Sequence, residues 1–208
     1  MADFLSRDPQ SSGFWDERFI KEFTPWDKGD VPLALQAFVQ ATTTPLTVLI
    51  PGCGNGYEVA YLAQAGWNVT AIDFSPAAVA SAKAIIGEWG RYVIEADFFS
   101  HVPAQAPDLI YERAFFCALP ASLRQSVVKR WAELLPPGAL LAGYFFYDET
   151  AADNPKGPPF PITRQQFQLL MAPMFELLEE RDVTDSIPVF AGRECWQIWR
   201  RRSDEALS

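Results

Sequence analysis

The 208-residue sequence is poor in the side chains that most often carry polar catalysis. It has one histidine, His101, and three cysteines, Cys53, Cys117 and Cys195. Three cysteines cannot all pair, and none stand in C-x-x-C spacing, so we expect a reducing, cytoplasmic compartment without a disulfide framework. The absence of a histidine and cysteine cluster argues against a metal site. It also leaves a histidine-activated cysteine nucleophile with little support.

Basic residues and long apolar runs are also scarce. The 17 basic and 26 acidic residues give a net charge of −9, which argues against nucleic-acid binding because phosphate backbones require a basic face. The N-terminus lacks an apolar core of signal-peptide length, and no run reaches ~18 apolar residues, so we expect no membrane partner. Apolar residues make up 49% of the chain, which fits one globular domain over residues 1–208.

What the sequence does contain is a regular alternation of strand and helix signals. Apolar or β-branched runs predict strands at 46–50, 68–73, 91–97, 107–112 and 139–147. Helical spacing predicts helices at 56–66, 75–86, 121–135 and 163–174, and two N-terminal helices at 14–23 and 31–41. Two further strands, 175–183 and 193–201, follow without a helix between them, which predicts an antiparallel pair.

This alternation predicts an α/β fold. We expect a doubly wound, mostly parallel seven-stranded sheet with an antiparallel C-terminal strand pair. Residues 1–40 would form an N-terminal helical lid, and residues 45–202 the catalytic core. The Pro- and Gly-rich stretch 153–161 is a long loop and a candidate wall of the active site.

A glycine loop follows the first predicted strand, in VLIPGCGNGYE at residues 48–58. Gly52, Gly54 and Gly56 would let a ligand lie directly on the backbone, at the strand end where doubly wound sheets bind ligands. Tyr57 replaces the third glycine of the dinucleotide fingerprint, and no P-loop lysine is present, so a pyrophosphate is a poor candidate. A tight strand-to-helix turn without a ligand is the alternative interpretation.

Acidic residues end the next two predicted strands. Asp73 can accept hydrogen bonds from both ribose hydroxyls of a nucleoside, or it can cap the following helix. Asp97 beside Phe98 suits an adenine, or the two form an ordinary polar turn with a core ring. A glycine loop, a ribose acid and an adenine acid make a nucleoside site without phosphate-binding groups. Such a site indicates S-adenosyl-L-methionine.

These features resemble the class I methyltransferases, and within them the thiopurine, thiol and halide methyltransferases. Five stretches between residues 14 and 202 carry the resemblance: TPWDKG at 24–29, LIPGCGNGYE at 49–58, AFFCALP at 114–120, KGPPF at 156–160, and FAGRECWQIWRR beginning at 190. The resemblance implies a Rossmann-like methyltransferase fold. It also implies an enzyme that converts S-adenosyl-L-methionine to S-adenosyl-L-homocysteine.

The resemblance also assigns roles to residues. The cofactor would contact Trp15, Trp26, Gly52, Cys53, Gly54, Asp73, Phe74, Asp97, Phe98 and Glu112. Arg113 matches the arginine of an Asp-Arg-Gly stretch in thiopurine enzymes, read here as Glu112-Arg113-Ala114, and would steer an anionic or thiolate acceptor. Tyr147 is the second candidate catalytic residue, as a pocket wall and the one plausible base.

Methyl transfer from a sulfonium is an in-line displacement in which a protein mainly supplies alignment and desolvation. A soft nucleophile needs little or no base, which agrees with a chain containing one histidine. We therefore expect methylation of a small acceptor such as a thiol, thiopurine, halide or other chalcogen, by a monomer or weak homo-oligomer. An O- or N-methyltransferase of a small metabolite and a non-catalytic module that binds S-adenosyl-L-methionine are the alternatives.

Overall fold

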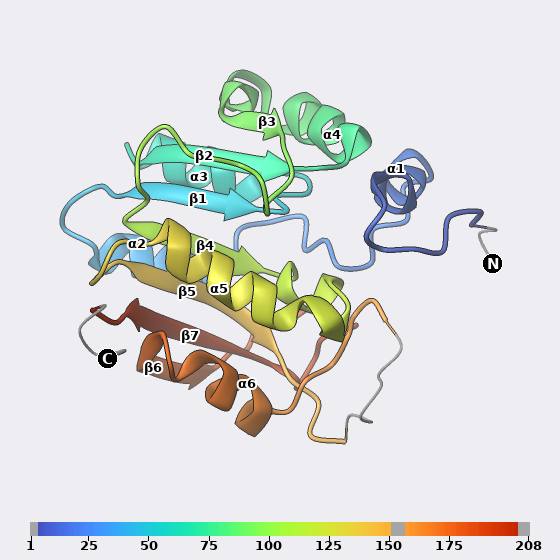
Figure 1. Ribbon diagram of the computed structural model, residues 1–208. Coiled ribbons are helices and arrows are strands. Elements are labelled where there is room, and N and C mark those ends of the chain that lie inside the picture. The colour runs from blue at the N-terminus through green and yellow to red at the C-terminus, as the bar shows by residue number, and fades with distance from the viewer. Residues whose placement is uncertain (1–3, 151–156, 204–208) are drawn as a thin grey trace. The chain divides into compact units, whose positions relative to one another are not determined.

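The computed structural model describes residues 4–150 and 157–203. Its strands are β1 (Thr47–Pro51), β2 (Asn68–Asp73), β3 (Val93–Glu95), β4 (Leu109–Arg113), β5 (Leu140–Phe146), β6 (Phe175–Asp182) and β7 (Glu194–Arg201). They form a seven-stranded sheet in the order β3-β2-β1-β4-β5-β7-β6 (Figure 1). Strands β2 and β3 pair in parallel, as do β4 and β5, whereas β7 runs antiparallel to both β5 and β6. The predicted α/β fold with its antiparallel C-terminal pair is confirmed.

The helices are α1 (Ser12–Ile20), α2 (Leu33–Ala41), α3 (Tyr57–Gln64), α4 (Pro76–Ile86), α5 (Arg124–Leu134) and α6 (Arg164–Met171). Three 3-10 helices, η1 (Gly87–Tyr92), η2 (Phe116–Ala118) and η3 (Ala121–Leu123), were not predicted because such short turns leave no periodic apolar signal. Three helix predictions need correction. Helix α1 ends at Ile20 instead of continuing to residue 23, and α6 ends at Met171 instead of continuing to residue 174. The helix predicted at 31–41 begins at Leu33, with Pro32 as its N-cap residue.

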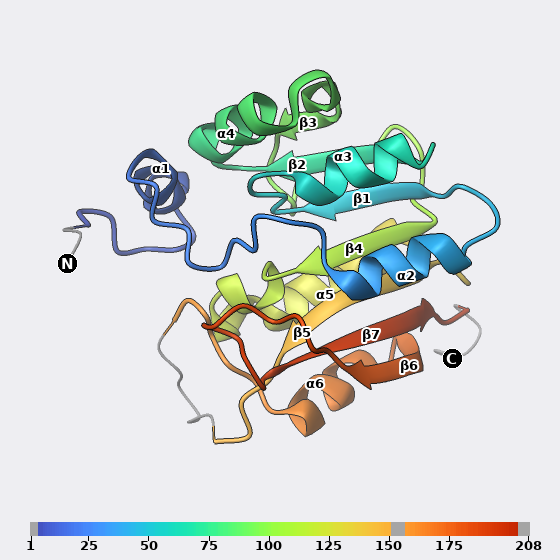
Figure 2. The ribbon, with the colours of Figure 1, turned by 180° about the vertical axis from the view of Figure 1, so that it is seen from behind.

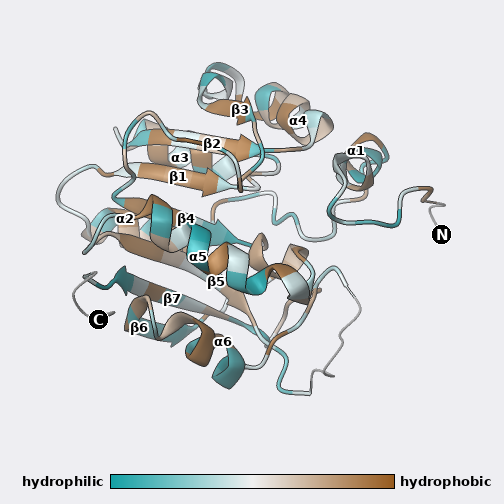
Figure 3. Ribbon diagram, viewed as in Figure 1, coloured by the Kyte–Doolittle hydropathy of each residue, from teal (hydrophilic) through white to brown (hydrophobic). Residues whose placement is uncertain are grey.

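Packing divides the chain into two compact units, which are described separately. Unit 1 comprises the described residues of Met1–Pro45 and Leu49–Val102, and unit 2 those of Leu46–Val48 and Pro103–Ser208. In unit 1 the apolar residues of β1 and β2, brown in Figure 3, are covered by helix α3. Ala71 on β2 and Val59 and Leu62 on α3 are fully buried. Near-continuous burial is typical of parallel strands that are covered on both faces.

Helix α1 of unit 1 packs against helix α4 (Figure 2). Ser75 caps α4 by accepting a hydrogen bond from the Ala78 N–H at 3.1 Å, and Pro76 occupies the first helical position. Asp16 on α1 accepts the Ser75 hydroxyl at 2.6 Å and the Ala77 N–H at 3.0 Å. A carboxylate from α1 thus lies at the positive end of the α4 dipole, where negative charge is favourable.

Aromatic residues form the core of unit 2. The ring of Phe167 on α6 is fully buried, with ring centroids 5.2 Å from Phe116, 5.0 Å from Phe145, 5.6 Å from Tyr147 and 5.9 Å from Trp199. Each such pair contributes roughly 0.5–1.5 kcal/mol beyond its buried area. Phe167 therefore joins helices α6 and η2 to the ends of β5 and β7.

Strands β4 and β5 of unit 2 approach closely at one point. Gly143 on β5 lies opposite Glu112 on β4, and a Cβ atom at Gly143 would lie 1.8 Å from the Glu112 carbonyl oxygen. No side chain fits in that space. The glycine therefore lets β5 lie against the backbone of β4 at the residue where β4 approaches its end.

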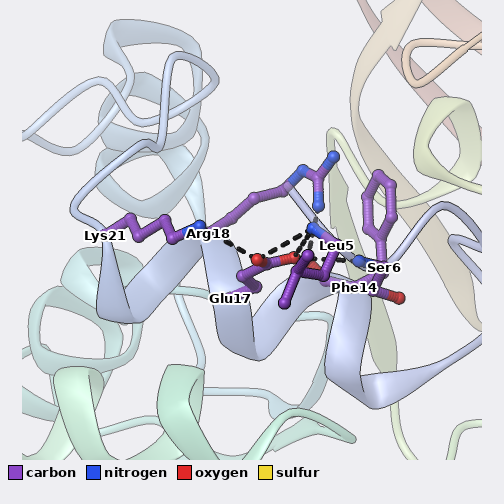
Figure 4. A network of polar contacts seen from close by, with 6 residues as sticks. All are labelled: Leu5, Ser6, Phe14, Glu17, Arg18 and Lys21. Atoms are coloured by element: carbon purple, nitrogen blue, oxygen red, sulfur yellow. Dashed lines mark hydrogen bonds and ion pairs between the residues drawn. The ribbon is translucent and has the colours of Figure 1, made fainter. Parts of the chain in front are cut away.

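The segment before α1 is fastened by Glu17 (Figure 4). Its carboxylate accepts the Leu5 N–H at 2.9 and 3.0 Å and the Ser6 N–H at 3.0 Å, and pairs with Lys21 Nζ at 2.9 Å. These contacts, first among them the Leu5 N–H, lower the pKa of the Glu17 carboxyl to about 2. On the same helix, the Arg18 guanidinium lies 3.2 Å from the centroid of the Phe14 ring.

We expect Glu17→Gln to speed hydrogen exchange at the amides of residues 5 and 6, because a neutral amide oxygen is a weaker acceptor than a carboxylate. In the unchanged protein the folded-state pKa of Glu17 is depressed. Its protection should therefore be present above the unfolded pKa of 4.5 and be lost as the pH falls toward 2. Exchange read by mass spectrometry checks both points, with Glu88→Gln on η1 as the control. Equal protection in the three proteins would contradict the fastening role.

Candidate functional site

The glycine loop of unit 1 has the backbone conformation of a ligand cradle. Gly52, Gly54 and Gly56 have φ angles of +60°, +52° and +75°, in the left-handed region that favours glycine. The Gly54 N–H donates to Asp73 Oδ2 at 3.2 Å, and the Cys53 N–H donates to the Ile72 carbonyl at 3.1 Å. The loop is thus held at the end of β2. Its backbone lies bare at Gly52, which is exposed.

Asp73 ends β2 and is 8% exposed. Its Oδ1 accepts the Ser75 N–H at 3.0 Å, opposite the Gly54 contact on Oδ2. Burial raises the pKa of Asp73 to about 6 against the lowering effect of these N–H groups, so the carboxyl is mostly ionised at pH 7. A carboxylate can accept about four hydrogen bonds and retains capacity for hydroxyl donors. The acid and the bare loop together fit a nucleoside.

The two tryptophans predicted at the cofactor come together in unit 1. The rings of Trp15 and Trp26 meet edge to face at 5.4 Å, and Phe19 contacts Trp26 at 6.1 Å. Phe19 also reaches the glycine loop, because its Cζ lies 3.8 Å from where a Gly54 Cβ would be. The Trp15 indole N–H donates to the Pro9 carbonyl at 2.8 Å. An aromatic cluster thus borders the cradle.

The TPWDKG segment is attached to the glycine loop by a contact that the sequence did not reveal. Asn55 donates a short hydrogen bond from Nδ2 to Asp27 Oδ2 and accepts the Ser81 hydroxyl of α4 at 2.6 Å. The position of Asn55 inside the glycine loop was the one feature of the sequence that could have pointed to this contact. For Asp16, which binds the start of α4, no sequence signal was available.

The predicted adenine residues lie at the end of β3, next to Asp73, whose carbonyl accepts the Ala96 N–H at 3.0 Å. Asp97 is exposed and accepts the Phe99 N–H at 3.3 Å and the Ser100 hydroxyl at 3.0 Å. Phe98 is 4% exposed. These contacts are those of a polar turn with a core ring, and the adenine role stays a prediction. Phe74, also predicted, is half-buried and follows Asp73 directly.

In unit 2 the acid at the end of β4 is more deeply buried. Glu112 is 1% exposed, and its Oε1 accepts the Phe115 and Phe116 N–H groups, both at 2.9 Å. Ala114 makes this turn with a φ of +57°, in the left-handed region that favours glycine, the residue at this position of the thiopurine Asp-Arg-Gly stretch. Burial, the largest cause, together with the charge of Glu194 raises the pKa of Glu112 to about 8, against the lowering effect of the two N–H groups and of Arg113.

Arg113 and Tyr147, the predicted catalytic residues, are both in unit 2. Arg113 is half-buried, with its guanidinium carbon 5.5 Å from the Tyr144 ring centroid. The Tyr147 hydroxyl donates to Gln197 Oε1 at 2.8 Å, and burial raises the Tyr147 pKa far above its ordinary value. A buried phenol that already donates a hydrogen bond is a poor general base, so this arrangement suits chemistry without one.

Glu112 and apolar side chains enclose a small pocket in unit 2. The lining residues are Glu112, Phe116, Cys117, Phe145, Phe146, Tyr147, Ile162 and Phe167. Burial raises the pKa of the Cys117 thiol well above its ordinary value, so Cys117 is unsuited to act as a nucleophile. The lining is therefore apolar apart from one carboxyl group, and its side chains stand too close together for a water molecule, so an acceptor can enter only if they move apart.

Two of the sequence stretches that carry the family resemblance meet beside this pocket. The Phe160 N–H donates to the Cys117 carbonyl at 2.6 Å, and Arg124 donates to the Pro161 carbonyl at 2.6 Å. This joins KGPPF to AFFCALP. Lys156 and residues 153–155 of the predicted loop lie outside the described residues.

The described residues contain neither a metal-binding cluster nor a helix suited to cross a membrane. Residues 4–150 and 157–203 contain no group of three or more His, Cys, Asp or Glu side chains able to hold a metal ion. Across the same residues, no helix has the length and apolar character to cross a membrane. His101 is half-buried, and its backbone N–H donates to the Asp97 carbonyl at 2.9 Å.

Comparison with known proteins identifies the family. The model of the family described as "Thiopurine S-methyltransferase (TPMT)" matches residues 10–202. The chain belongs to the thiopurine S-methyltransferase family. Thiocyanate methyltransferase 1 of Arabidopsis thaliana is 29% identical, over 97% of this chain and 89% of that protein. Thiopurine S-methyltransferase of Shewanella woodyi is 28% identical, over 87% of this chain and 92% of that protein.

A solved structure has the same fold. The 1,6-didemethyltoxoflavin-N1-methyltransferase of Burkholderia thailandensis superposes with a TM-score of 0.75 at 16% identity, covering 97% of this chain and 94% of that one. This likeness confirms the Rossmann-like methyltransferase fold. Membership of the thiopurine S-methyltransferase family confirms the predicted methyltransferase activity, with S-adenosyl-L-methionine as the methyl donor. A non-catalytic binding module is thereby set aside.

We expect Ala114→Gly to leave the free energy of unfolding unchanged or raise it by up to about 1 kcal/mol. Glycine relieves the strain of a left-handed backbone at φ +57°, which stabilises the folded state. It also increases the conformational entropy of the unfolded chain, which offsets part of that stabilisation. The matched control is Ala80→Gly on the exposed face of α4, where the same replacement should cost about 1 kcal/mol. Urea unfolding measures both. A loss at residue 114 as large as that at residue 80 would contradict the strain.

Proposed function

We propose that this member of the thiopurine S-methyltransferase family methylates a small, soft nucleophile: a thiol, thiopurine, thiocyanate, halide or other chalcogen. The observation that carries the proposal is the apolar pocket of unit 2, whose one phenol, Tyr147, already donates to Gln197. Soft anions react without a base, whereas hydroxyl and amine acceptors must lose a proton. The names of the relatives, thiocyanate and thiopurine methyltransferases, agree with sulfur acceptors.

We propose that unit 1 holds the cofactor. Asp73 accepts the ribose hydroxyls, and Gly52, Cys53 and Gly54 present their backbone to it. The bound cofactor supplies an activated methyl group on a sulfonium. Ring faces attract such a cation by about 0.5–2 kcal/mol, a role for Trp15 and Trp26. The remaining cofactor contacts predicted in unit 1 are Phe74, Asp97 and Phe98. Glu112, which the sequence also placed at the cofactor, lies in unit 2 and lines the apolar pocket there.

We propose that unit 2 receives the acceptor. The rings of the pocket exclude water, which removes the hydration shell of a nucleophile and raises its reactivity. The cation of Arg113, on the same strand as Glu112, compensates part of the lost hydration of an anion. An O- or N-methyltransferase remains the alternative, with Tyr147 as its base. The hydrogen bond from the Tyr147 hydroxyl to Gln197 makes that alternative the weaker one.

We further propose one methyltransferase domain over residues 1–208, with a lid at 1–40 and a core at 45–202, working in the cytoplasm as a monomer or weak homo-oligomer. The three free, buried cysteines support a reducing compartment. The net charge of −9 supports the absence of nucleic-acid and membrane-surface partners.

A panel of acceptors with labelled S-adenosyl-L-methionine tests the proposed function. We expect methyl transfer to thiols, thiopurines, thiocyanate and iodide, and none to hydroxyl and amine compounds of matched size. Labelled product from hydroxyl or amine acceptors alone would overturn the proposal and point to the base-dependent alternative.

For the cofactor half, we expect Asp73→Asn to weaken cofactor binding by roughly 10- to 100-fold, because ribose hydroxyls lose a buried acceptor, at about 1–3 kcal/mol. In the unchanged protein, affinity should fall as the pH drops below about 6, since the hydroxyls favour the ionised Asp73. The variant should lose this pH dependence. Calorimetry at pH 5 to 8 checks both, with Glu95→Gln, an exposed acid on β3, as the control. Unchanged affinity in Asp73→Asn would refute the ribose contact.

A further inference from the structure

One carboxyl oxygen of Glu112 has no hydrogen-bond partner among the described residues. This oxygen is Oε2, which is buried, whereas Oε1 accepts two backbone N–H groups. Buried polar atoms are almost always hydrogen-bonded. Because Glu112 lines the pocket, its unpartnered Oε2 indicates a place where a ligand could bind. The sequence placed Glu112 at the cofactor. The structure shows it lining the apolar pocket of unit 2.

The two N–H groups on Oε1 also fix where a proton can sit. An oxygen that faces two donors from Phe115 and Phe116 cannot itself carry a hydrogen toward them. A neutral Glu112 must therefore carry its proton on Oε2, which becomes an O–H donor. The pKa of about 8, raised by burial, supports a neutral carboxyl at pH 7.

The groups around Glu112 favour this neutral form. Cys117 on η2 and Tyr147 after β5 stay uncharged, because burial raises the pKa of both. Glu194 on β7 repels a negative charge on Glu112, while Arg113 on the same strand attracts one. Burial has the largest influence on the pKa of Glu112, and it favours the protonated, neutral carboxyl.

We propose that the Oε2–H group of neutral Glu112 donates a hydrogen bond to a small anionic acceptor, such as a halide, pseudohalide or thiolate, in this pocket. An O–H donor facing an anion makes a strong, charge-assisted hydrogen bond. An ionised Glu112 would repel the same anion. Glu112 therefore selects acceptors that enter already charged. This inference rests on the proposed function and adds the charge state of the acceptor.

No proton is transferred in this role. A lone pair of the anion forms the new bond to the methyl carbon, and the electrons of the broken carbon–sulfur bond remain on the departing sulfur. The Glu112 proton stays on Oε2 throughout. A neutral thiol would instead have to lose its proton before it could use this pocket, since the protonated carboxyl cannot accept one.

The test is the pH dependence of KM for iodide and for thiocyanate, which are anions across pH 6 to 9.5. In the unchanged protein, KM should rise above a pH of about 8, approaching tenfold per pH unit. In Glu112→Gln the amide oxygen must face the two N–H donors, which leaves the NH₂ group as a permanent donor in place of Oε2–H. Its KM should stay within about threefold of the unchanged value at pH 7 and should not rise.

Two further measurements separate the outcomes. Glu194→Gln removes a repelling charge and lowers the pKa of Glu112, so the rise in KM should begin at lower pH. Calorimetry should find the cofactor affinity of Glu112→Gln unchanged within about twofold. If that variant folds poorly, the profiles of the unchanged protein and of Glu194→Gln still decide.

Four results would overturn the inference. A KM that is independent of pH in the unchanged protein removes it and leaves the proposed function intact. A weaker cofactor affinity in Glu112→Gln with an unchanged KM assigns Glu112 to the cofactor instead. Failure to methylate either anion at any pH, with thiols still methylated, limits the proposed function to thiols. Failure with every acceptor of the panel removes both proposals.

Discussion

Backbone N–H groups that point at a buried carboxyl shape each of the two units. In unit 1 the N–H groups of Gly54 and Ser75 hold Asp73, and in unit 2 those of Phe115 and Phe116 hold Glu112. A buried carboxyl without such donors would be strongly destabilising. Asp73 receives one N–H from the glycine loop that follows β1 and one from the turn after its own strand. Glu112 receives both of its N–H groups from the turn that the left-handed Ala114 makes after β4.

The two acids differ in charge because their surroundings differ. The pKa of Asp73 is raised to about 6 and that of Glu112 to about 8. Near neutral pH the first accepts hydrogen bonds as a carboxylate and the second can donate one as an acid. Paired acids whose environments separate their pKa values commonly take separate roles in enzymes. Under the proposed function, Asp73 would accept the ribose hydroxyls and Glu112 would donate to the nucleophile, so that methyl transfer to an anion needs no base.

The N-terminal segment is attached to unit 1 by carboxylates as well. Asp16 binds the start of α4, Glu17 holds residues 5 and 6, and Asp27 binds Asn55 of the glycine loop. These contacts bring the aromatic cluster of Trp15, Phe19 and Trp26 beside the cradle. The role of residues 1–40 as a lid stays a prediction.

The amino-acid sequence by itself determined the elements and the family. Residues 68–73 and the helix after Ser75 have the predicted bounds, because strand composition and helix capping are signals between neighbours in the chain. The glycine loop could also be recognised from neighbouring residues in the chain, and its lack of side chains indicated that a ligand lies on the backbone. Only the tertiary structure decided the Asp16 contact to Ser75, 59 positions away, and the deep burial of Glu112, which raises the pKa of its carboxyl. That burial comes from side chains that folding brings from other elements, such as Phe167, and the charge of Glu194 on β7 raises the pKa as well. No local pattern at Glu112 records those neighbours.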